Sequence, residues 1–386
     1  MIFESNMEWK EYELGELLSY EQPTPYIVES TDYNDKYTTP VLTAGKTFIL
    51  GYTNETQGIY AALPVIIFDD FTTASRYVNF EFKVKSSAMK ILTPNTKLVL
   101  PKFIYYRMQA IQFDHSTHKR YWIQQYSKIK VAIPPIPVQE QIVSYIEELF
   151  SELDNGVATL QKTKQQLAVY RQAVLKSAFS DIAPDEYKPL RSVFLGSPQN
   201  GLYKPKTAYG SGTRILRIDG FYDGRILDDY DFKRLELSES EIEQYQLNKR
   251  DLVVNRVNSM PYLGKCALVR DLAEVTVYES NMMRVKLDTT RVDPEYVTYY
   301  LSSFMGRKEL TKNAKQAVNQ ASINQTDVGN ALIPVPDTLE QQRNTVFAIN
   351  ARMSVCDNIE KTVDIALQQA EAMRQSILKQ AFEGKI

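Results

Sequence analysis

Two long stretches of the chain carry an apolar residue at every seventh position. In the first stretch these residues are Ile146, Leu153, Leu160, Leu167 and Val174, and in the second they are Ile349, Cys356, Val363, Ala370 and Ile377. The two series are offset by 203 residues at every step. Sustained seven-residue spacing is typical of a coiled-coil seam rather than of the broader apolar face of a globular helix. The sequence therefore predicts two long helices.

The companion positions of this seam, three residues after each of the first, are less regular. They are Leu149, Gly156, Thr163 and Tyr170 in the first stretch and Arg352, Ile359, Ala366 and Met373 in the second. Neither stretch makes a strong zipper alone, so we expect the two helices to pair with each other, each about 60 Å long at roughly 1.5 Å per residue. The alternative is two independent amphipathic helices, each lying on its own domain.

The segments that flank the two stretches are also duplicated. Residues 133–141 (IPPIPVQEQ) and 333–341 (IPVPDTLEQ) precede them, and residues 171–179 (RQAVLKSAF) and 374–382 (RQSILKQAF) end them. The second copy has three more residues between its Glu-Gln pair and the matching aspartate, which predicts one extra short turn near the start of the second helix. A chain duplicated in this way can present two similar faces to a partner with two-fold symmetry. Double-stranded DNA is the commonest such partner.

Strand patterns occur in the regions that precede each long stretch. Residues 64–68 and, after Asp251, the rest of residues 251–254 are apolar, and both segments predict buried strands. Residues 78–85 alternate between apolar and polar side chains, which predicts a half-buried strand with a polar, partly basic face.

A further helix is predicted near the end of each of these regions. Asp293 is a good N-cap with Pro294 in the first turn, and a counterpart with the same proline and aromatic pattern starts at Pro101. The apolar residues expected on one face of the later helix are Val297, Tyr300, Leu301 and Phe304. The order is therefore lobe, long helix, lobe, long helix: an α+β fold with two mixed lobes and an internal pseudo-two-fold repeat.

Composition is that of an ordinary globular protein of two or three domains, with 386 residues, 44% hydrophobic and 24% charged. Cys266 and Cys356 are too few for a disulfide framework or a Cys-rich zinc site. No run approaches the roughly 20 apolar residues of a membrane helix, and the acidic N-terminus does not resemble a signal peptide. We therefore expect a cytoplasmic protein with no membrane partner.

The net charge of −2 conceals a segregation of charge along the chain. Residues 1–36 carry two basic and nine acidic residues, whereas residues 37–133 carry twelve basic and five acidic ones. A basic surface on one lobe is the electrostatic pattern expected for phosphate contacts. The alternative is a solvated charged face with no partner.

Motifs for catalysis and for metal binding do not stand out. Residues 44–47 (AGKT) resemble the end of a phosphate-binding loop, but Pro40 stands where that loop needs a glycine. His115 and His118 lack an accompanying cluster of ligands, so no metal is expected. The sequence has no Ser/His/Asp order typical of nucleophilic catalysis and no glycine-rich dinucleotide-binding motif. It also lacks the Asn/Asp-Pro-Pro-aromatic motif of adenine methyltransferases. We therefore expect a protein without catalytic residues.

Several polar segments combine cations, hydroxyls and amides, a mixture suited to phosphates and base edges. The alternative for each is a polar loop or a satisfied turn. The candidate DNA-binding residues of the first lobe are Lys46, Thr47, Thr72, Thr73, Ser75, Arg76, Lys83, Lys85, Ser86, Ser87, Lys90, His118, Lys119 and Arg120. Those of the second lobe are Asn255, Arg256, Asn258, Lys312, Lys315, Asn319, Gln320, Ser322 and Asn324.

The duplicated segments 134–141 with 171–179, and 334–341 with 374–382, resemble those of type I restriction–modification specificity subunits. The first lobe also resembles a known class of target recognition domain, through residues 40–54 and 65–72. The resemblance covers essentially the whole chain. It implies target recognition domains at residues 1–138 and 181–336, and long spacer helices at 139–180 and 337–386 that form an antiparallel coiled coil.

The resemblance also implies a division of labour among subunits. Each lobe would read one half of a bipartite, asymmetric DNA site, and the helices would set the unread spacer. Two methyltransferase subunits would bring S-adenosylmethionine, and restriction–translocase subunits would bring ATP and Mg, so this chain would bind no cofactor and catalyse nothing. Two alternatives remain: a coiled-coil scaffold that does not read DNA, and a DNA methyltransferase or nuclease with an unrecognised active site.

Overall fold

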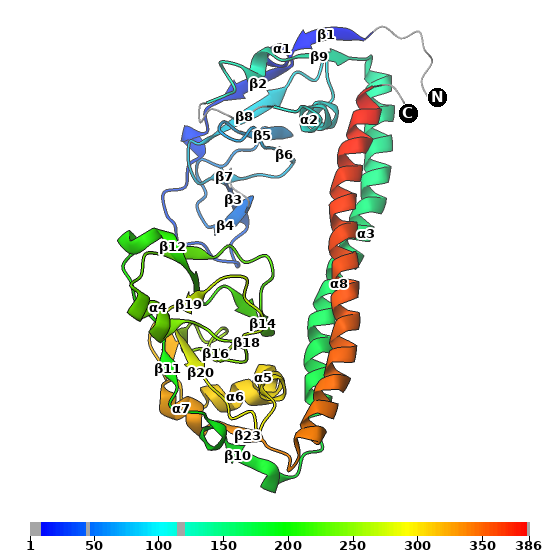
Figure 1. The fold of residues 1–386 in the computed structure, drawn as a ribbon. Helices are drawn as coiled ribbons and strands as arrows, with labels where there is room; N and C mark the ends of the chain where they lie inside the picture. The colour runs from blue at the N-terminus through cyan, green and yellow to red at the C-terminus, as the bar shows by residue number, and fades with distance from the viewer. Residues whose placement is uncertain (1–8, 44–46, 114–119, 384–386) are drawn as a thin grey trace. The chain divides into compact units, whose positions relative to one another are not determined.

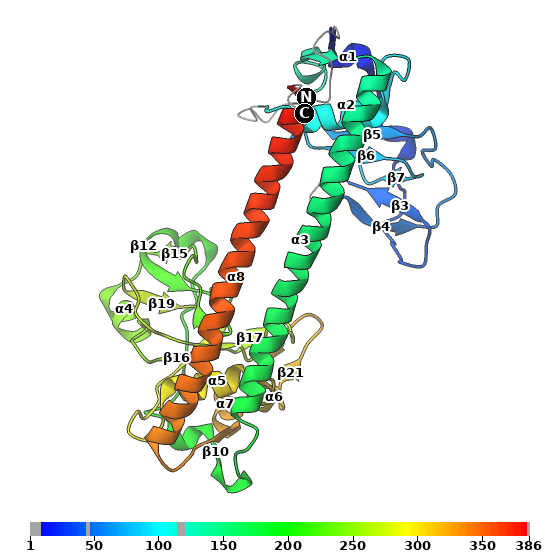
Figure 2. The same cartoon turned by 90° about the vertical axis from the view of Figure 1, so that its right-hand side faces the viewer.

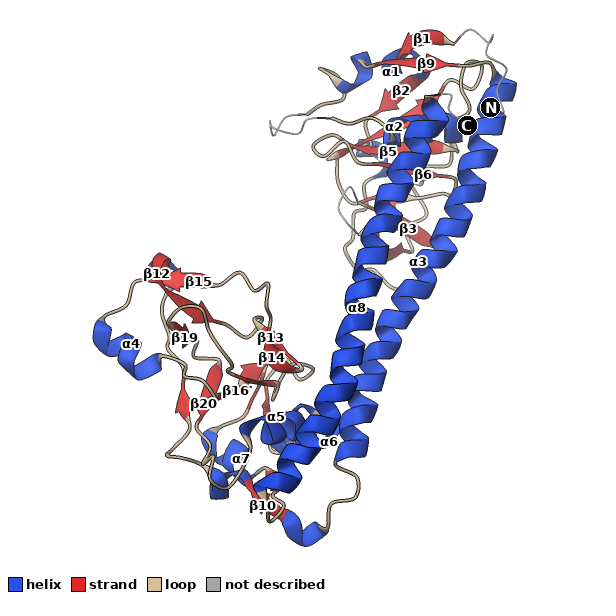
Figure 3. Ribbon diagram, turned by 45° about the vertical axis from the view of Figure 1, so that its right-hand side comes forward, coloured by secondary structure: helices blue, strands red, loops and turns tan. Residues whose placement is uncertain are grey.

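The computed structural model describes residues 9–43, 47–113 and 120–383. The chain forms two compact units, each of which is described by itself. The first unit comprises residues 1–161 and 364–386, and the second comprises residues 162–363. Each unit contains one strand-rich lobe and one part of each of two long helices, α3 (Ile136–Ala178) and α8 (Leu339–Phe382), which contain 43 and 44 residues (Figures 1 and 3).

Lobe 1, the part of the first unit that precedes α3, contains three sheets. A four-stranded antiparallel sheet has the order β2-β8-β5-β6, a three-stranded sheet has the order β4-β3-β7, and β1 pairs with β9. The strands are β1 (Lys10–Glu13), β2 (Leu18–Glu21), β3 (Thr39–Leu42), β4 (Ile49–Thr53), β5 (Val65–Asp69), β6 (Ser75–Val78), β7 (Lys83–Val84), β8 (Met89–Pro94) and β9 (Lys130–Ile133). The helices are α1 (Leu14–Leu17) and α2 (Pro101–Gln109).

Lobe 2, the part of the second unit between α3 and α8, is built around a six-stranded mixed sheet of order β11-β20-β16-β18-β14-β13. Smaller sheets have the orders β15-β12-β19, β17-β22-β21 and β10-β23. The strands are β10 (Tyr187–Pro189), β11 (Gln199–Asn200), β12 (Tyr209–Leu216), β13 (Phe221–Tyr222), β14 (Gly224–Ile226), β15 (Lys233–Leu235), β16 (Leu252–Asn255), β17 (Val257–Asn258), β18 (Cys266–Leu268), β19 (Thr276–Tyr278), β20 (Met282–Val285), β21 (Lys315–Gln316), β22 (Ala321–Ser322) and β23 (Leu332–Pro334). The helices are α4 (Glu239–Tyr245), α5 (Pro294–Ser302), α6 (Phe304–Thr311) and α7 (Gln325–Asn330).

Most of the predicted local elements are present, and two are corrected. The buried strands are β5 and β16, and Asp293 caps α5 by accepting hydrogen bonds from the two backbone N–H groups at 295 and 296. Residues 78–85 do not form one strand, because β6 ends at Val78 and β7 starts only at Lys83. Phe304 does not share the face of α5: the Ser303 hydroxyl caps a new helix, α6, and leaves the Phe304 side chain 77% exposed.

The long helices pack against the lobes and against each other in antiparallel directions within each unit. In the first unit the beginning of α3, through Ile142 and Ile146, and the end of α8, through Leu378, belong to one hydrophobic core with lobe 1. In the second unit the end of α3, through Val174, and the beginning of α8, through Ile349, belong to one core with lobe 2. This arrangement confirms the predicted α+β fold with two long helices in contact, and it is inconsistent with the two independent amphipathic helices.

Burial along the helices places the companion seam one residue later than the sequence suggested. The residues of the seven-residue series are buried or partly buried. At most steps their companions lie four positions further on rather than three: Phe150, Val157 and Arg171 are less exposed than Leu149, Gly156 and Tyr170, and Met353, Glu360 and Arg374 are less exposed than Arg352, Ile359 and Met373. Thr163 is an exception, because it is less exposed than Lys164, and Ala366 and Leu367 are both half-buried. The later series includes the charged residues Arg171, Glu360 and Arg374, which an apolar pattern does not reveal.

A fully buried glutamine attaches the start of α3 to lobe 1. The side-chain amide of Gln139 donates to the carbonyl oxygens of Pro134 (2.8 Å) and Leu98 (3.1 Å), and its carbonyl oxygen accepts from the N–H of Leu100 (2.8 Å). Leu100 is the N-cap of α2, whose first-turn N–H groups have no intrahelical acceptor. One side chain therefore satisfies backbone groups in the segments that lead into two separate helices, α2 and α3.

Gln342, 203 residues later, makes the same attachment in the second unit. Its amide donates to the carbonyl oxygens of Arg291 (3.2 Å) and Pro336 (3.4 Å), and it accepts from the N–H of Asp293 (2.8 Å). Helices α3 and α8 also begin 203 residues apart. The predicted extra turn at the start of the second helix is therefore wrong, because the three additional residues lie in the connection that follows Pro334.

In the part of the chain that the structure describes, no helix is both long enough and apolar enough to cross a membrane. The helices that have the required length, α3 and α8, carry charged residues throughout.

We predict that Gln139→Leu lowers the free energy of unfolding of the first unit by about 1–3 kcal/mol, because it leaves buried backbone groups without partners. Both tryptophans, Trp9 and Trp122, lie in this unit, so tryptophan fluorescence during urea unfolding reports on it selectively. Gln141→Leu, an exposed position on the same helix, is the matched control. Equal losses in the two variants would contradict a specific role for the buried glutamine.

Candidate nucleic-acid interface

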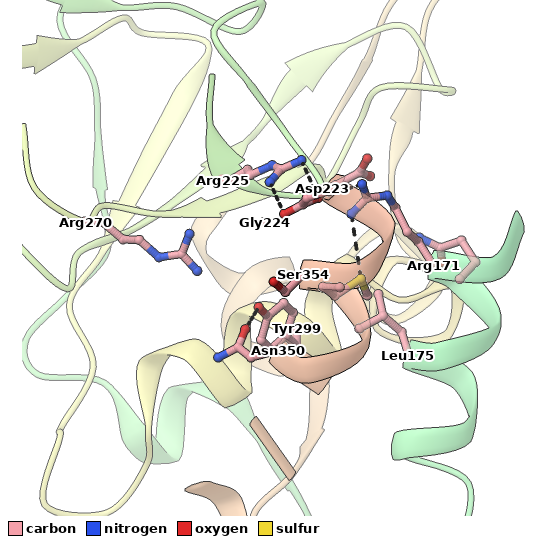
Figure 4. A pocket seen from close by; sticks show the side chains of 12 residues that line it. Arg171, Leu175, Asp223, Gly224, Arg225, Arg270, Tyr299, Asn350 and Ser354 are labelled. Carbon is pink, nitrogen blue, oxygen red and sulfur yellow. Dashed lines mark hydrogen bonds and ion pairs between the residues drawn. The ribbon is translucent and has the colours of Figure 1, made fainter. Parts of the chain in front are cut away.

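The second unit contains an ionic cluster that joins both long helices to lobe 2 (Figure 4). Arg171 of α3 contacts two carboxylates of α8, Asp357 at 2.6 Å and Glu360 at 2.9 Å. Arg225 of β14 donates to both carboxylate oxygens of Asp357. The distances are 2.9 Å to Oδ2 and 3.2 Å to Oδ1, the oxygen that Arg171 also contacts. Burial alone would raise the pKa of the Asp357 carboxyl group, but the hydrogen bonds from Arg225 and Arg171 outweigh burial and hold this pKa below its usual value.

The cluster borders a cavity of about 300 Å³ in the second unit. Its remaining wall includes Arg270, whose guanidinium is paired with Glu295 at 2.5 Å, and Tyr299, whose hydroxyl donates to the side chain of Asn350 on α8 (Figure 4). The charges around this cavity are thus largely paired with one another. The arrangement suits a structural junction between a lobe and two helices.

The first unit repeats the interhelical part of this cluster. Arg374 of α8 pairs with Asp154 of α3, and its guanidinium lies 4.3 Å from the ring centre of Phe150. Arg374 and Asp154 are each 203 residues from Arg171 and Asp357. The same pair of residues therefore links the helices in both units, with the donor on α3 in one and on α8 in the other.

The lobes contribute differently to these two pairs. In the second unit Arg225 joins the pair from lobe 2, whereas no described residue of lobe 1 forms an ion pair with Asp154 or Arg374. A polar cavity of about 690 Å³ lies there instead, lined by Arg76 and Tyr105 of lobe 1 among others. The repeat is thus conserved between the helices and altered where the lobes meet them.

In lobe 1 the turn between β5 and β6 and the first two residues of β6 carry four of the candidate DNA-binding residues. Thr72 and Arg76 are exposed, and Thr73 is half-buried with a left-handed backbone (φ 56°). Ser75 is buried and its hydroxyl accepts a hydrogen bond of 2.7 Å from Gln109. Thr72 and Arg76 are therefore accessible at this turn, whereas Ser75 has a partner inside the lobe.

Two of the candidate lysines of lobe 1 are buried and paired. Lys83 is 3% exposed and lies 3.0 Å from Glu55 and 2.6 Å from the carbonyl oxygen of Gln57. Lys90 is 1% exposed and lies 3.5 Å from Asp70. A paired ammonium in the interior cannot reach a phosphate without breaking its ion pair. In this structure the two lysines are therefore bonded within lobe 1.

The other candidates of lobe 1 fall into two groups. The first group is exposed and consists of Thr47, Lys85, Ser86, Ser87 and Arg120. The second group lies outside the described residues and consists of Lys46, His118 and Lys119.

In lobe 2 the segment from the last residue of β16 to the end of β17 is largely engaged in the fold. Asn255 is fully buried, and both polar atoms of its side chain lack a partner among the described residues. Arg256 donates to the carbonyl oxygen of Ser280 (3.0 Å), and the Asn258 side chain accepts from the N–H of Ser259 (2.8 Å). Arg256 and Asn258 are half-buried, so they reach the surface only in part.

The small sheet β17-β22-β21 brings together candidates that are about sixty positions apart in sequence. Asn258 pairs with Ala321, and Ser322 pairs with both Val257 and Lys315. The exposed candidates beside this sheet are Lys312, Lys315, Asn319, Gln320 and Asn324. The hairpin β21–β22 thus carries the largest group of exposed candidates in lobe 2.

One cationic residue near this sheet was not identified from the sequence. The ammonium of Lys265 lies 3.9 Å from the ring centre of Tyr222 and 4.4 Å from that of Tyr262. Burial and the nearby Arg307 lower its pKa, against an opposing effect of Asp223. Tyr262 precedes Lys265 by three positions in the segment before β18, whereas Tyr222 belongs to β13, so no local sequence signal marks Tyr222 as a neighbour of Lys265.

Comparison with known proteins identifies the family. A model described as the type I restriction modification DNA specificity domain matches residues 6–167. The specificity subunit of the type I restriction enzyme EcoR124I/EcoR124II from Escherichia coli is 34% identical over 359 residues, which cover 87% of this chain and 84% of that protein. The chain belongs to the type I restriction enzyme specificity subunits. The resemblance inferred from the duplicated motifs is thereby confirmed.

Other relatives agree with this assignment. The EcoKI specificity subunit from Escherichia coli strain K12 is 30% identical over 271 residues, which cover 67% of this chain and 58% of that protein. A chain from a structure concerned with complex assembly and conformational transition of the type I R-M system has a TM-score of 0.65 at 16% identity, with 98% of each chain covered. As a member of this family, the chain recognises DNA target sequences as a non-catalytic component of a type I restriction–modification complex.

We predict that Arg171→Met destabilises the helix pair of the second unit by about 1–3 kcal/mol, because two carboxylates lose a mostly buried partner. Arg374→Met, its equivalent in the repeat, should cost less than about 1 kcal/mol, since Asp154 is 62% exposed. Hydrogen exchange of α8 amides near Met353 and near Arg374 measures the two effects. Equal costs would show that burial does not decide the strength of this pair.

Proposed function

We propose that lobe 1 and lobe 2 each read one half of a bipartite, asymmetric DNA site, and that the complex then methylates adenine in this site or restricts DNA that lacks the methyl mark. The observation that supports the proposal is that the internal repeat is retained where the helices attach and is altered in the lobes. The attachments of the helices are duplicated, through Gln139 with Gln342 and through the two arginine–aspartate pairs. The strands and exposed polar groups of the lobes differ.

The same repeat supports a partner arrangement with two copies of one subunit. Two methyltransferase subunits would dock on the duplicated helix surfaces and bring S-adenosylmethionine, and restriction–translocase subunits would bring ATP and Mg. The chain itself would bind double-stranded DNA and none of these cofactors, and the complex would act in the cytoplasm. The domains would be residues 1–138 and 181–336 for DNA recognition, with residues 139–180 and 337–386 as spacer helices.

The proposed DNA contacts are the accessible members of the candidate set. In lobe 1 these are the exposed residues Thr47, Thr72, Arg76, Lys85, Ser86, Ser87 and Arg120. In lobe 2 they are the exposed residues of the β21–β22 hairpin with Arg256 and Asn258 beside it. Phosphate contacts from such cations would make binding fall steeply as salt increases.

Mapping of methylated adenines across the genome, with and without this gene, tests the proposal. We expect a single bipartite motif with two different halves that disappears when the gene is deleted. Binding of duplex DNA by the reconstituted complex should weaken strongly with salt. A flat salt response would favour a scaffold that does not read DNA, and methyl transfer by the purified chain alone would favour an enzyme with an unrecognised active site.

We predict that removal of one heptad from each helix, residues 160–166 and 363–369, shortens the unread spacer and leaves both half-sites intact. The two deletions are equivalent in the repeat and retain both arginine–aspartate pairs. Seven residues span roughly 10 Å at about 1.5 Å per residue, which corresponds to a few base pairs at about 3.4 Å each. Methylation mapping gives the new spacer, and an unchanged spacer would refute the role of the helices as a ruler.

A further inference from the structure

The hairpin of residues 315–322 in lobe 2 contains the longest run of exposed residues among the candidate segments that the structure describes. Strands β21 and β22 form it, and a hydrogen bond from the N–H of Ala317 to the carbonyl oxygen of Gln320 (2.7 Å) closes its turn. All residues from 315 to 320 are exposed, and the Val318 side chain is 99% exposed. Strand β17 pairs with β22, which leaves β21 as the outer strand of the sheet (Figure 2).

Polar side chains on either side of this hairpin are already used by the fold. The Asn324 side chain accepts hydrogen bonds from the first N–H groups of α7. The Gln325 amide donates to the carbonyl oxygen of Pro198 at 2.8 Å, and Lys312 pairs with Glu309 at 2.7 Å. These side chains hold the ends of the hairpin segment in place.

The side chains of the hairpin itself are not used in this way. Within the described residues, the amides of Asn319 and Gln320 have no hydrogen-bond partner, and the ammonium of Lys315 has no ion pair. No aspartate or glutamate occurs between Leu310 and Thr326. The hairpin therefore presents free amides, one apolar side chain and one unpaired cation on a segment without negative charge.

The shape and chemistry of this hairpin match the major groove of B-DNA. A two-stranded β-ribbon fits this groove, which is about 12 Å wide. An asparagine or glutamine amide can bond to both N6 and N7 of adenine, and an aliphatic side chain can contact the thymine methyl group. A lysine that carries no ion pair can contact a phosphate and so fix the position of the ribbon.

We propose that this hairpin enters the major groove of the half-site read by lobe 2, where Asn319 and Gln320 read adenine and Val318 contacts the thymine methyl group. The half-site of lobe 2 then contains at least one A·T pair whose identity depends on this turn, and Lys315 contacts the adjacent backbone. This inference rests on the proposed function, since it requires that lobe 2 reads its own half-site.

Binding of modified duplexes by the reconstituted complex with its methyltransferase subunits tests the inference. The duplexes carry the mapped site, with each adenine of the lobe 2 half-site replaced in turn by 7-deazaadenine, which lacks the N7 acceptor. We expect binding to fall about tenfold or more at one or two adjacent positions. Asn319→Ala and Gln320→Ala should lower binding of the unmodified duplex by a similar factor and lose the sensitivity to 7-deazaadenine at one of these positions.

Replacement of thymine by uracil, which removes only the methyl group, tests the role of Val318. The wild-type complex should lose affinity for uracil at the position concerned, whereas the Val318→Ala complex should bind both duplexes equally. Lys315→Ala should weaken binding to all sequences alike and reduce the salt dependence by about one phosphate contact. Asn248→Ala is the matched control, because Asn248 is an exposed amide at the opposite end of β16. It should bind like the wild type.

Two results would overturn the inference while leaving the proposed function in place. One is a wild-type complex that recognises two half-sites but tolerates 7-deazaadenine throughout the half-site of lobe 2. The other is a uniform loss, or no loss, of binding in the Asn319→Ala and Gln320→Ala complexes with base preference unchanged. By contrast, a wild-type complex without two distinct half-sites would refute the proposed function itself.

Discussion

A buried glutamine at the start of each long helix determines how a lobe is attached in this protein. The side-chain amide of Gln139 or Gln342 donates to two carbonyl groups, one in the connection that leads into its own long helix and one in the loop before a helix of the lobe. Its side-chain oxygen accepts a hydrogen bond from the N-cap N–H of this lobe helix. Because these hydrogen bonds are buried or partly buried, a shift of the helix that breaks them costs free energy. The direction in which each helix leaves its lobe is therefore fixed by hydrogen bonds rather than by apolar contact alone.

The register of the two helices depends on a second kind of contact. Apolar residues along a seam tolerate sliding by a heptad, whereas charged groups within the seam do not, because a shifted register leaves them desolvated and unpaired. Arg171 with Asp357, and Arg374 with Asp154, mark the same register in both units, and the more buried pair of the second unit constrains it more strongly. Arg225 adds a lobe to the pair of the second unit, so the position of lobe 2 and the register of its helices are coupled.

The sequence predicted the elements that depend on apolar period and on capping chemistry. The long helices, the buried strands β5 and β16 and the capped helix α5 follow from local patterns that the structure retains. The companion seam could not be predicted in the same way, because two of its positions are Arg171 and Arg374, and an apolar pattern passes over charged residues. The misplaced extra turn has a different cause: the sequence comparison matched the Glu-Gln pairs at 140–141 and 340–341, whereas in the structure the equivalent residues are Gln139 and Gln342.

Residue type alone could not separate free polar groups from those that have a partner in the fold. Lys83, Lys90 and Asn324 have the same chemistry as Lys315 and Asn319, yet the former have partners contributed by distant or neighbouring segments. Such partners follow from tertiary packing, which a single sequence does not display. The distinction matters for recognition, because a side chain already bonded within the protein loses that bond when it contacts DNA. Selectivity for a base is therefore expected from side chains that have no hydrogen-bond partner within the fold. The helix attachments of this specificity subunit do not involve such side chains, so these side chains can change without disturbing the duplicated helices.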